Sequence, residues 1–385
     1  MSLFLLAGLA VIATALAWLT HRLVWVPKWR ARWLRWAVPV VVVVLTGLNY
    51  FQLGAGLTAL SPATARPLVW AGAVWLAAFF YLGLGAVAVS VLSLLVGVGA
   101  RLRGADKARR RAGRVRLHRV GVPLVVAGAL VVTGAGVARA GNPEVTQVTV
   151  AAGDLPAAFD GVTVALVTDL HAGPVRSAAF TQEVVDTVNA AHPDLVLLAG
   201  DLVDGPVGRY GPEIVPLSGL RAPLGVYAVT GNHEMYTDSI AGWEQEWRTL
   251  GITVLNNAAV PVARGGDRIW IGGVNDWSGV GAFAPDYRAT LAGIAPKDFA
   301  LVMAHQPRAA TNLDPRLVDL QVSGHTHGGQ LWPVRYLVPI QQPMVDGYAV
   351  VNGIPVLTSR GVGTWGPPVR VAADPQIPLI TLRRG

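Results

Sequence analysis

Four uncharged apolar runs in the first 140 residues constrain the fold of this chain more than any other feature. Each run is long enough to cross a hydrocarbon core of about 30 Å, a distance that takes roughly 20 helical residues. The runs are Leu3–Leu19, Ala37–Leu57, Leu68–Val98 and Val120–Ala138. A soluble protein with buried helices is the alternative, which four uncharged runs of this length disfavour. We therefore expect residues 1–140 to form a transmembrane region of about four helices in a lipid bilayer.

Basic residues lie unevenly between these runs, and their positions predict an orientation. Five Lys or Arg residues lie between the first two runs, only Arg66 between the second and third, and nine between the third and fourth. Cytoplasmic loops carry the excess of basic residues, so we expect the first and third loops in the cytoplasm. An even number of spans then places everything after residue 140 on the extracytoplasmic side of the cell membrane. Ala138-Arg139-Ala140 also resembles a signal-peptidase site, but we favour retention of the downstream domain over its release.

The charge of the chain divides at the same boundary. Only 14% of all residues are charged, against about 25% in a typical soluble domain. Residues 1–140 carry 16 basic residues and one acid, a net charge of +15, whereas residues 141–385 carry 15 basic and 22 acidic residues, a net charge of −7. A membrane explains the basic excess of the apolar region, and we expect no nucleic-acid partner. Cysteine is absent, which excludes disulfides and thiolate metal ligands.

Residues 141–385 change abruptly to a globular pattern in which apolar strands alternate with helical segments. Eight short apolar runs, many of them bounded by Gly or Pro, are typical of strands. They are Val162–Thr168, Leu195–Ala199, Val226–Thr230, Ile269–Gly272, Ala300–Ala304, Leu320–Ser323, Pro355–Thr358 and Ile377–Leu382. Phe180, Val184 and Val188 recur at helical spacing after Ser177, a suitable N-cap. These patterns predict an α/β layered domain large enough to bury its own core.

Five polar clusters each follow one of these strands. They are Asp169-Leu170-His171, Gly200-Asp201-Leu202-Val203-Asp204, Gly231-Asn232-His233-Glu234, His305, and Gly324-His325-Thr326-His327. Open α/β sheets build their sites at the carboxyl ends of strands, so we expect these clusters to meet. One cluster alone is explained by an ordinary turn or a structural histidine, but five in order at strand ends are not.

The residue types in these clusters favour a metal centre. Asp, His and Asn supply oxygen and imidazole nitrogen without thiolate, which suits Mn²⁺, Fe or Zn²⁺. Two such ions about 3.5–4 Å apart can clamp a phosphoryl group during in-line attack. We expect Gly200, Gly231 and Gly324 to allow sharp backbone turns that direct the next side chain toward an ion.

The ordered set D-x-H, G-D-x-x-D, G-N-H-E, H and G-H-x-H resembles the calcineurin-like metallophosphoesterase superfamily over essentially residues 160–360. The form G-H-T-H-G-G-Q, with Ser359-Arg360-Gly361-Val362-Gly363 downstream, is similar to a bacterial membrane- or cell-wall-associated subgroup. The resemblance implies a β-sandwich flanked by helices for residues 141–385. It also implies two divalent metal ions as cofactors, for which we favour Mn²⁺ and keep Fe and Zn²⁺ as alternatives.

The same resemblance assigns the metal ligands. It implies one ion on Asp169, His171 and His327, a second ion on Asn232, His305 and His325, and a bridging role for Asp201.

Three further residues, His233, Asp204 and Arg360, are candidates for catalysis or substrate binding, and a fourth, Glu234, has a structural role. The resemblance places His233 over the leaving group as general acid or electrostatic partner, outside the metal ligands. We expect Asp204 to orient its loop or His233 rather than to bind metal, and Glu234 to hold the turn. Arg360, in its glycine-rich setting, is a candidate phosphate clamp, with a solvated loop residue as the alternative.

Together these inferences predict a membrane-anchored, metal-dependent phosphoesterase. A hydroxide held between two metal ions would attack phosphodiester, phosphomonoester or pyrophosphate bonds of envelope or lipid-linked substrates. Two alternatives stay open. One is a membrane-tethered metal-binding scaffold of the same fold without catalysis. The other is a nuclease-like phosphodiesterase, which the negative charge of residues 141–385 disfavours.

Overall fold

In the computed structural model, which describes residues 3–52 and 60–385, contacts divide the chain into two units. The first is helical and ends at Gly136. The second consists of Leu60–Arg66 and Val137–Gly385.

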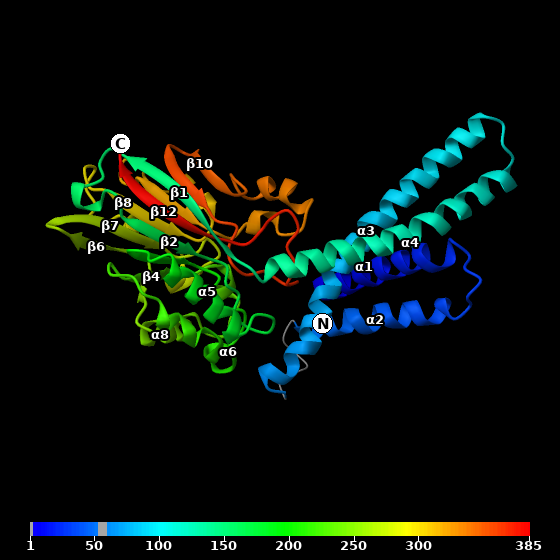
Figure 1. Cartoon of the computed structure of the whole chain (residues 1–385), viewed down its shortest axis with the longest axis horizontal. Helices are drawn as coiled ribbons and strands as arrows, with labels where there is room; N and C mark the ends of the chain where they lie inside the picture. The colour runs from blue at the N-terminus through cyan, green and yellow to red at the C-terminus, as the bar shows by residue number, and fades with distance from the viewer. Residues whose placement is uncertain (1–2, 53–59) are drawn as a thin grey trace. The chain divides into compact units, whose positions relative to one another are not determined.

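Four α-helices cover the four predicted apolar runs within the described residues. They are α1 (Leu3–Thr20), α2 (Leu34–Gln52), α3 (Pro62–Leu102) and α4 (Lys107–Ala140) (Figure 1). The end of the second run, near Leu57, lies outside the described residues. By length and apolarity α3 and α4 qualify as membrane spans, whereas the shorter apolar helical stretches Ala10–Trp25 and Leu34–Asn49 overlap the first two runs. Within the described residues there are therefore two candidate spans by this measure, and the count of four stays a prediction.

Two six-stranded sheets form the centre of the second unit. The first has the order β1-β12-β2-β3-β4-β5 and the second β10-β11-β9-β8-β7-β6. The strands of the first sheet are β1 (Glu144–Ala152), β2 (Thr163–Val167), β3 (Leu195–Ala199), β4 (Val226–Val229), β5 (Thr253–Val254) and β12 (Gln376–Arg384). Those of the second sheet are β6 (Ala258–Arg264), β7 (Asp267–Val274), β8 (Ala300–Ala304), β9 (Leu320–Ser323), β10 (Gly347–Val351) and β11 (Ile354–Thr358).

Parallel pairing brings the carboxyl ends of the inner strands to one edge of each sheet. In the first sheet β2, β3, β4 and β5 run parallel, and in the second β7, β8, β9 and β11 do so. The strands β6 and β10 pair antiparallel at the margins of the second sheet, and β12 pairs antiparallel with β2. The turns that follow the inner strands therefore gather at these edges.

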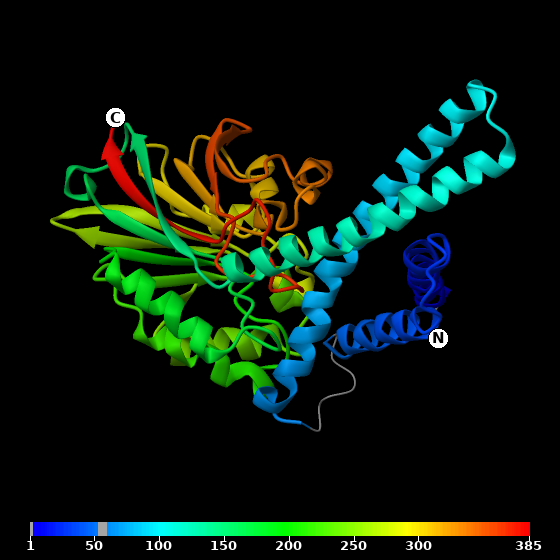
Figure 2. The same ribbon diagram turned by 45° about the vertical axis from the view of Figure 1, so that its right-hand side comes forward.

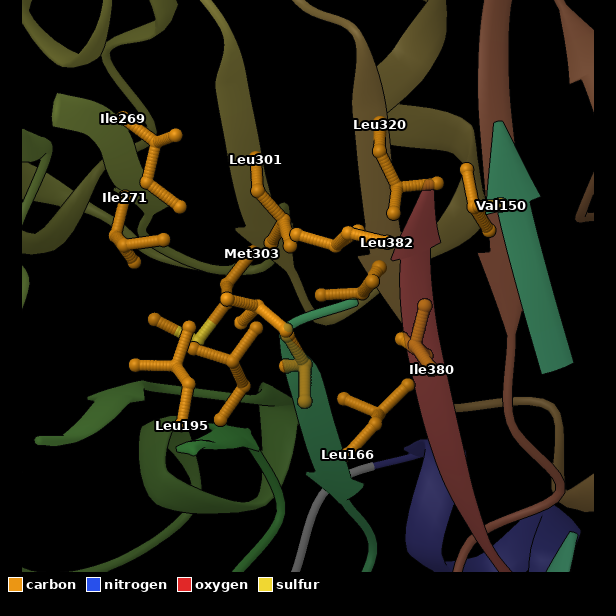
Figure 3. Close-up of a cluster of buried hydrophobic side chains, with 14 of the residues drawn as sticks. Val150, Leu166, Leu195, Ile269, Ile271, Leu301, Met303, Leu320, Ile380 and Leu382 are labelled. Carbon is orange, nitrogen blue, oxygen red and sulfur yellow. The ribbon is translucent and has the colours of Figure 1, made fainter. Parts of the chain in front are cut away.

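The inner strands are apolar on both faces, because each face packs against a different layer. In β3, Leu195, Leu197 and Ala199 belong to the core between the two sheets, whereas Val196 and Leu198 pack with the helices that cover the first sheet. Figure 3 shows the core between the sheets, with Leu166 and Ile380 among the residues that lie opposite those of the second sheet.

Helices cover the outer faces of both sheets (Figures 1 and 2). The first sheet packs against α5 (Ala178–Ala190), α6 (Val207–Ile214) and α8 (Ile240–Thr249). In α8 the fully buried Trp243 and Trp247 lie one helical turn apart and anchor the helix to the sheet. The second sheet is covered by the short helix α9 (Tyr287–Thr290) and a 3-10 turn at Pro307–Thr311.

The predicted α/β layered domain is confirmed, with two sheets flanked by helices. All eight predicted strands are present, and Ser177 occupies the N-cap position of α5, although its side chain makes no capping hydrogen bond. The sequence did not indicate β1, β5, β6 and β10. A functional division at residue 140 stays a prediction.

Candidate metal centre

The seven predicted ligands follow five strand ends, three in the first sheet and two in the second. Asp169 and His171 follow β2, Asp201 follows β3, Asn232 follows β4, His305 follows β8, and His325 and His327 follow β9. The His305 ring joins the two sheets, because its Nδ1 lies 2.8 Å from the carbonyl oxygen of Ala199 at the end of β3. The structure therefore brings all five strand ends to one place.

Six of these residues, together with His233, form three overlapping groups of ligand atoms. The groups are Asp169, His171 and His327; His171, Asp201 and His233; and Asp201, His305 and His325. Within each group the ligand atoms lie within 4.8 Å of one another. The seventh predicted ligand, Asn232, lies beside the third group, with its Oδ1 2.8 Å from His325 Nδ1. His171 and Asp201 each belong to two of these groups, so both lie where the groups overlap.

The nitrogen and oxygen atoms of the predicted ligands face one another in an arrangement that suits a bound cation better than hydrogen bonds among themselves. The Nε2 atoms of His171 and His327 lie 3.1 Å apart, and Nε2 of His327 lies 3.2 Å from Asp169 Oδ1. His305 Nε2 is buried and makes no hydrogen bond, although Asp201 Oδ2 lies 3.1 Å away. Because Nδ1 of His305 faces a carbonyl oxygen and must donate to it, Nε2 is the nitrogen left for a cation. Nitrogen and oxygen donors converging in this way suit Mn²⁺, Fe or Zn²⁺.

Charge coupling between Asp201 and the histidines is strong. Burial raises the pKa of Asp201, but His305, His233 and His171 outweigh it and hold that pKa well below its usual range. Burial likewise lowers the pKa of His305, but the charge of Asp201 outweighs it and raises that pKa well above its usual range. A cation bound between them would displace the proton of His305, so its affinity falls as the pH falls.

Five of the seven predicted ligands have left-handed backbone conformations. Their φ values are 58° for Asp169, 51° for His171, 53° for Asp201, 71° for His325 and 51° for His327. Such conformations cost of order 1–3 kcal/mol each and persist where the surroundings impose them, typically at functional sites. The strained backbone conformations therefore occur at residues that the sequence predicts to be metal ligands.

The glycines beside the ligands act in two different ways. Gly200 has a φ of +87°, as the predicted sharp turn requires. Gly231 and Gly324 do not adopt positive φ and are needed for close approach instead. A Cβ on Gly231 would lie 2.2 Å from Asp201 Oδ1, and one on Gly324 would lie 2.3 Å from Asp169 Oδ2. At these two positions glycine is needed because a side chain would displace a predicted ligand, not because the backbone adopts a positive φ.

Asp204 holds two histidines at once. Its Oδ1 lies 2.9 Å from Nδ1 of His171 and 2.6 Å from Nδ1 of His233. A carboxylate only accepts, so both rings donate from Nδ1, and His171 keeps Nε2 for a cation. Burial raises the pKa of Asp204, but the two histidines outweigh it and lower that pKa far below its usual range.

His233 lies over the cluster with a raised pKa. Burial lowers its pKa, but the charges of Asp201 and Asp204 and the hydrogen bond to Asp204 outweigh burial and raise that pKa to about 9. Tyr236 and Trp365 flank the ring, with centroids 5.5 and 6.5 Å from it, and both aromatic side chains are largely exposed. A protonated imidazole between exposed aromatic rings can donate to a group that enters from solvent.

The Arg360 side chain interacts with two acidic residues of the protein. Its Nε donates to the carbonyl oxygen of Asp374 at 2.8 Å, and its Nη1 lies 3.4 Å from Asp346 Oδ2. The side chain passes Gly328, where a Cβ would lie 2.8 Å from the Arg360 Cδ. A phosphate-binding role for Arg360 stays a prediction.

Sequence reasoning missed Arg370, which supports the loops around His327. The guanidinium is fully buried and donates to the carbonyl oxygens of Gly361, Gly363, His327 and Ala373. Burial lowers its pKa to about 9. The residue follows Pro367-Pro368-Val369 in an irregular segment, so neither periodicity nor a strand end could have indicated it.

This two-sheet α/β domain, with nitrogen and oxygen ligands gathered at its strand ends, defines the class of a metal-dependent phosphoesterase. The family described as Calcineurin-like phosphoesterase matches residues 162–329. A metallophosphoesterase of Bacillus subtilis is 30% identical over 271 residues, which cover 67% of this chain and 93% of that relative. The chain belongs to the calcineurin-like metallophosphoesterase family, as the resemblance predicted.

Eukaryotic relatives add a membrane connection. A protein of Danio rerio named "Transmembrane protein with metallophosphoesterase domain" is 32% identical over 271 residues, covering 68% of this chain and 62% of that protein. A relative of the same name from Bos taurus is 32% identical over 257 residues, covering 63% and 57%. This chain thus spans about three fifths of their length. Within the described part of this chain, α3 and α4 are long and apolar enough to cross a membrane.

Two solved structures show weak overall likeness. A phosphopantetheinyl hydrolase from Mycobacterium tuberculosis has a TM-score of 0.32 at 13% identity, over 51% of this chain and 88% of its own. A dimetal phosphatase from Danio rerio has a TM-score of 0.33 at 14% identity, over 53% and 88%.

Proposed function

We propose that this chain is a membrane-anchored phosphoesterase with two divalent metal ions. The observation that carries the proposal is the position of Asp201 Oδ2, which lies 3.9 Å from His171 Nε2 and 3.1 Å from His305 Nε2, one histidine of each proposed ion site. Asp169, His171 and His327 would hold one ion, Asn232, His305 and His325 the other, and Asp201 both. We favour Mn²⁺, with Fe and Zn²⁺ as alternatives. Bound divalent ions would activate water and neutralise charge on the phosphoryl oxygens.

The protein's own groups would supply the proton for the leaving group. We infer that His233 donates this proton, because its ring lies beside His171 and Asp201 and is flanked by the exposed side chains of Tyr236 and Trp365. Asp204 would hold the ring in the donating orientation through Nδ1. General acid assistance of this kind is typically worth 10²–10⁴ in rate.

The substrates proposed are phosphodiesters, phosphomonoesters or pyrophosphates of envelope or lipid-linked molecules. This choice rests on the membrane connection and on the net charge of −7 over residues 141–385, which disfavours a nuclease-like role on polyanionic strands. A catalytically silent metal-binding scaffold is the second alternative. Metal-dependent hydrolysis of any chromogenic phosphodiester would exclude it.

Assay of the full chain in detergent with Mn²⁺ tests the reaction. Bis(p-nitrophenyl) phosphate, p-nitrophenyl phosphate and pyrophosphate would identify the bond type. Asp201→Asn keeps an oxygen for the backbone N–H of His233, which lies 2.8 Å from Oδ1, but loses the second carboxylate oxygen. This variant should lose turnover and bind fewer than two ions per chain, whereas the exposed Asp238→Asn control should behave as wild type. Full activity of Asp201→Asn, or of thoroughly chelated protein, would exclude the two-ion proposal.

We further propose a multi-pass topology with the catalytic unit on the extracytoplasmic side. Five and nine basic residues in the first and third loops, against Arg66 in the second, support it. A C-terminal alkaline phosphatase fusion should be active in intact cells, and a C-terminal green fluorescent protein fusion exported through the general secretory route should stay dark. The opposite pair of results would place the site in the cytoplasm.

A further inference from the structure

A short segment after the last ligand exposes a cluster of large apolar side chains. We call Trp332–Ile340 the aromatic lobe; it contains two 3-10 turns, Val334–Tyr336 and Val338–Ile340, and is drawn in orange beside β10 in Figures 1 and 2. Trp332 is 49% exposed, Tyr336 69%, Leu337 60% and Ile340 78%. Single exposed apolar residues are ordinary, but here four lie within nine residues of the chain, and clusters of exposed apolar side chains mark interaction sites.

Polar contacts tie the aromatic lobe to the end of α4. Arg139, in the last turn of α4, lies 3.1 Å from Asp374 Oδ1. The carbonyl oxygen of Asp374 accepts a hydrogen bond from Arg360, whose Nη1 lies 3.4 Å from Asp346 Oδ2. The other carboxylate oxygen of Asp346 lies 3.4 Å from Nη2 of Arg335, in the lobe. All five residues belong to the second unit, so the lobe lies near the point where a candidate membrane span ends.

The aromatic lobe is also attached to the candidate metal centre. Gly329, two residues after His327, approaches the backbone of Arg335 so closely that a Cβ would lie 2.4 Å from the Arg335 Cα. The side chain of Gln330 accepts from the backbone N–H of Trp365 and donates to its carbonyl oxygen, both at 2.9 Å. Trp365 in turn flanks His233. The lobe is therefore packed beside one wall of the site.

We propose that the aromatic lobe docks into the interfacial layer of the lipid bilayer that holds this chain's own helices. Trp and Tyr favour the headgroup level, where an apolar ring and a polar tip are both accommodated. Leu337 and Ile340 supply aliphatic side chains that can enter the acyl boundary. Arg139, Arg335 and Arg360 lie alongside but pair with Asp374 and Asp346, so the proposal rests on the exposed apolar and aromatic side chains. Docking would hold the candidate metal centre at headgroup depth, where lipid-linked phosphoesters lie.

The absence of cysteine allows a direct test in the full chain. Ile340→Cys, labelled with the environment-sensitive fluorophore NBD, is reconstituted in nanodiscs of phosphatidylcholine and phosphatidylglycerol without substrate. We expect blue-shifted emission and quenching by phosphatidylcholine that carries a doxyl group near its headgroup. Val280→Cys is the matched control, because Val280 is also 78% exposed and lies in a different loop. It should show neither effect.

The outcomes separate the bilayer from other partners of the lobe. Unshifted, unquenched NBD at residue 340 would refute docking, and equal responses at 280 and 340 would refute a specific role for the lobe. A shift that appears only when an amphiphilic phosphoester is added would also refute it and would assign the lobe to the substrate's acyl chain. The emission shift and the quenching do not require catalysis. A negative result would therefore refute docking without bearing on the proposed reaction.

Activity on two substrates supplies a second measurement. The double variant Leu337→Asp, Ile340→Asp should hydrolyse soluble bis(p-nitrophenyl) phosphate as wild type, and should lose activity on a phosphoester embedded in vesicles. Both side chains are largely exposed, so unchanged soluble activity also shows that the variant is folded. Equal activity of the variant and the wild type on the embedded substrate would contradict docking, whatever the soluble rates.

Discussion

Glu234 offers the sharpest test of how the candidate metal centre is held. Its fully buried carboxylate accepts four backbone hydrogen bonds: Oε2 from Gly231 at 2.6 Å and Asp201 at 3.0 Å, and Oε1 from Leu202 at 2.8 Å and Val203 at 3.2 Å. One side chain thus fastens the loop after β3 to the loop after β4. These two loops carry Asp201 and Asn232.

Replacing the carboxylate by an amide removes half of these acceptors. In Glu234→Gln the NH₂ group cannot accept, so two buried N–H groups lose their partner at about 1–3 kcal/mol each. The substitution also has an opposing, stabilising effect, because it removes the buried negative charge of Glu234. Burial and the charge of Asp201 disfavour that charge and raise the pKa of Glu234 to about 7. From the ordinary value of 4.5 such a rise corresponds to about 3 kcal/mol. We expect Glu234→Gln to lose about 2 kcal/mol of unfolding free energy, and Glu234→Ala, which strands four N–H groups, to lose more than about 4 kcal/mol.

Thermal unfolding of the full chain in detergent, followed by tryptophan fluorescence, measures this loss. The buried Trp243 and Trp247 report on the second unit, and a loss of 2 kcal/mol corresponds to a Tm lower by about 4–8 °C. Glu183→Gln, on the exposed face of α5, is the control and should change stability by less than about 0.5 kcal/mol. Equal Tm values for Glu234→Gln and Glu183→Gln would refute the assignment of the four hydrogen bonds.

The sign of the pH dependence gives an independent check in chelated protein. The folded protein binds the proton of Glu234 more tightly than the unfolded chain does, since its pKa is raised from 4.5 to about 7. Stability from this group is therefore present below pH 4.5 and is lost as the pH rises toward 7. Glu234→Gln should remove that slope between pH 4.5 and 7. An unchanged slope would mean that another group titrates there.

Three further predictions concern the surroundings of His233. His233→Ala should lose roughly 10²–10⁴ in rate while keeping its metal content, with a smaller loss for good leaving groups, and a fall in bound metal by elemental analysis would make His233 a ligand instead. Asp204→Asn removes a charge that raises the pKa of His233, so the alkaline limb of kcat/KM should move to lower pH; an unmoved limb would argue against His233 as the acid. Trp365→Ala should raise KM several-fold for substrates with bulky apolar leaving groups, since an aromatic contact is worth about 1 kcal/mol, whereas the exposed Tyr348→Ala should leave KM unchanged.

The inner strands could be predicted from the sequence because a strand that is buried on both faces consists mostly of apolar residues. β3 and β8 are buried on both faces, so each reads as an unbroken apolar run. β1 and β10 are half-exposed and carry mixed residues, and β6 contains Pro261. Their pairing depends on partners supplied by the fold: β1 pairs along its whole length with β12, at the far end of the chain. The residues of β1 alone therefore do not indicate that β12 is the strand with which they pair.

The candidate ligands were predictable for a related reason, whereas their supports were not. Each ligand directly follows a strand, so chain order alone brings it to the sheet edge. Arg370 and the aromatic ring of Trp365 reach the same place through irregular loops, by way of Gln330 and the carbonyl oxygens around His327. Their positions follow from loop packing, which a single sequence does not reveal.

Backbone hydrogen bonds between neighbouring strand ends help to fix the candidate ligands. Left-handed conformations at Asp169, His171 and Asp201 cost of order 1–3 kcal/mol each. The N–H of Asp169 donates to the carbonyl oxygen of Gly200 and that of His171 to the carbonyl oxygen of Asp201, both at 3.0 Å. These bonds do not involve the Asp201 side chain. A substitution that changes only the ligand atom, such as Asp201→Asn, should therefore alter ion binding while the strand ends keep their places.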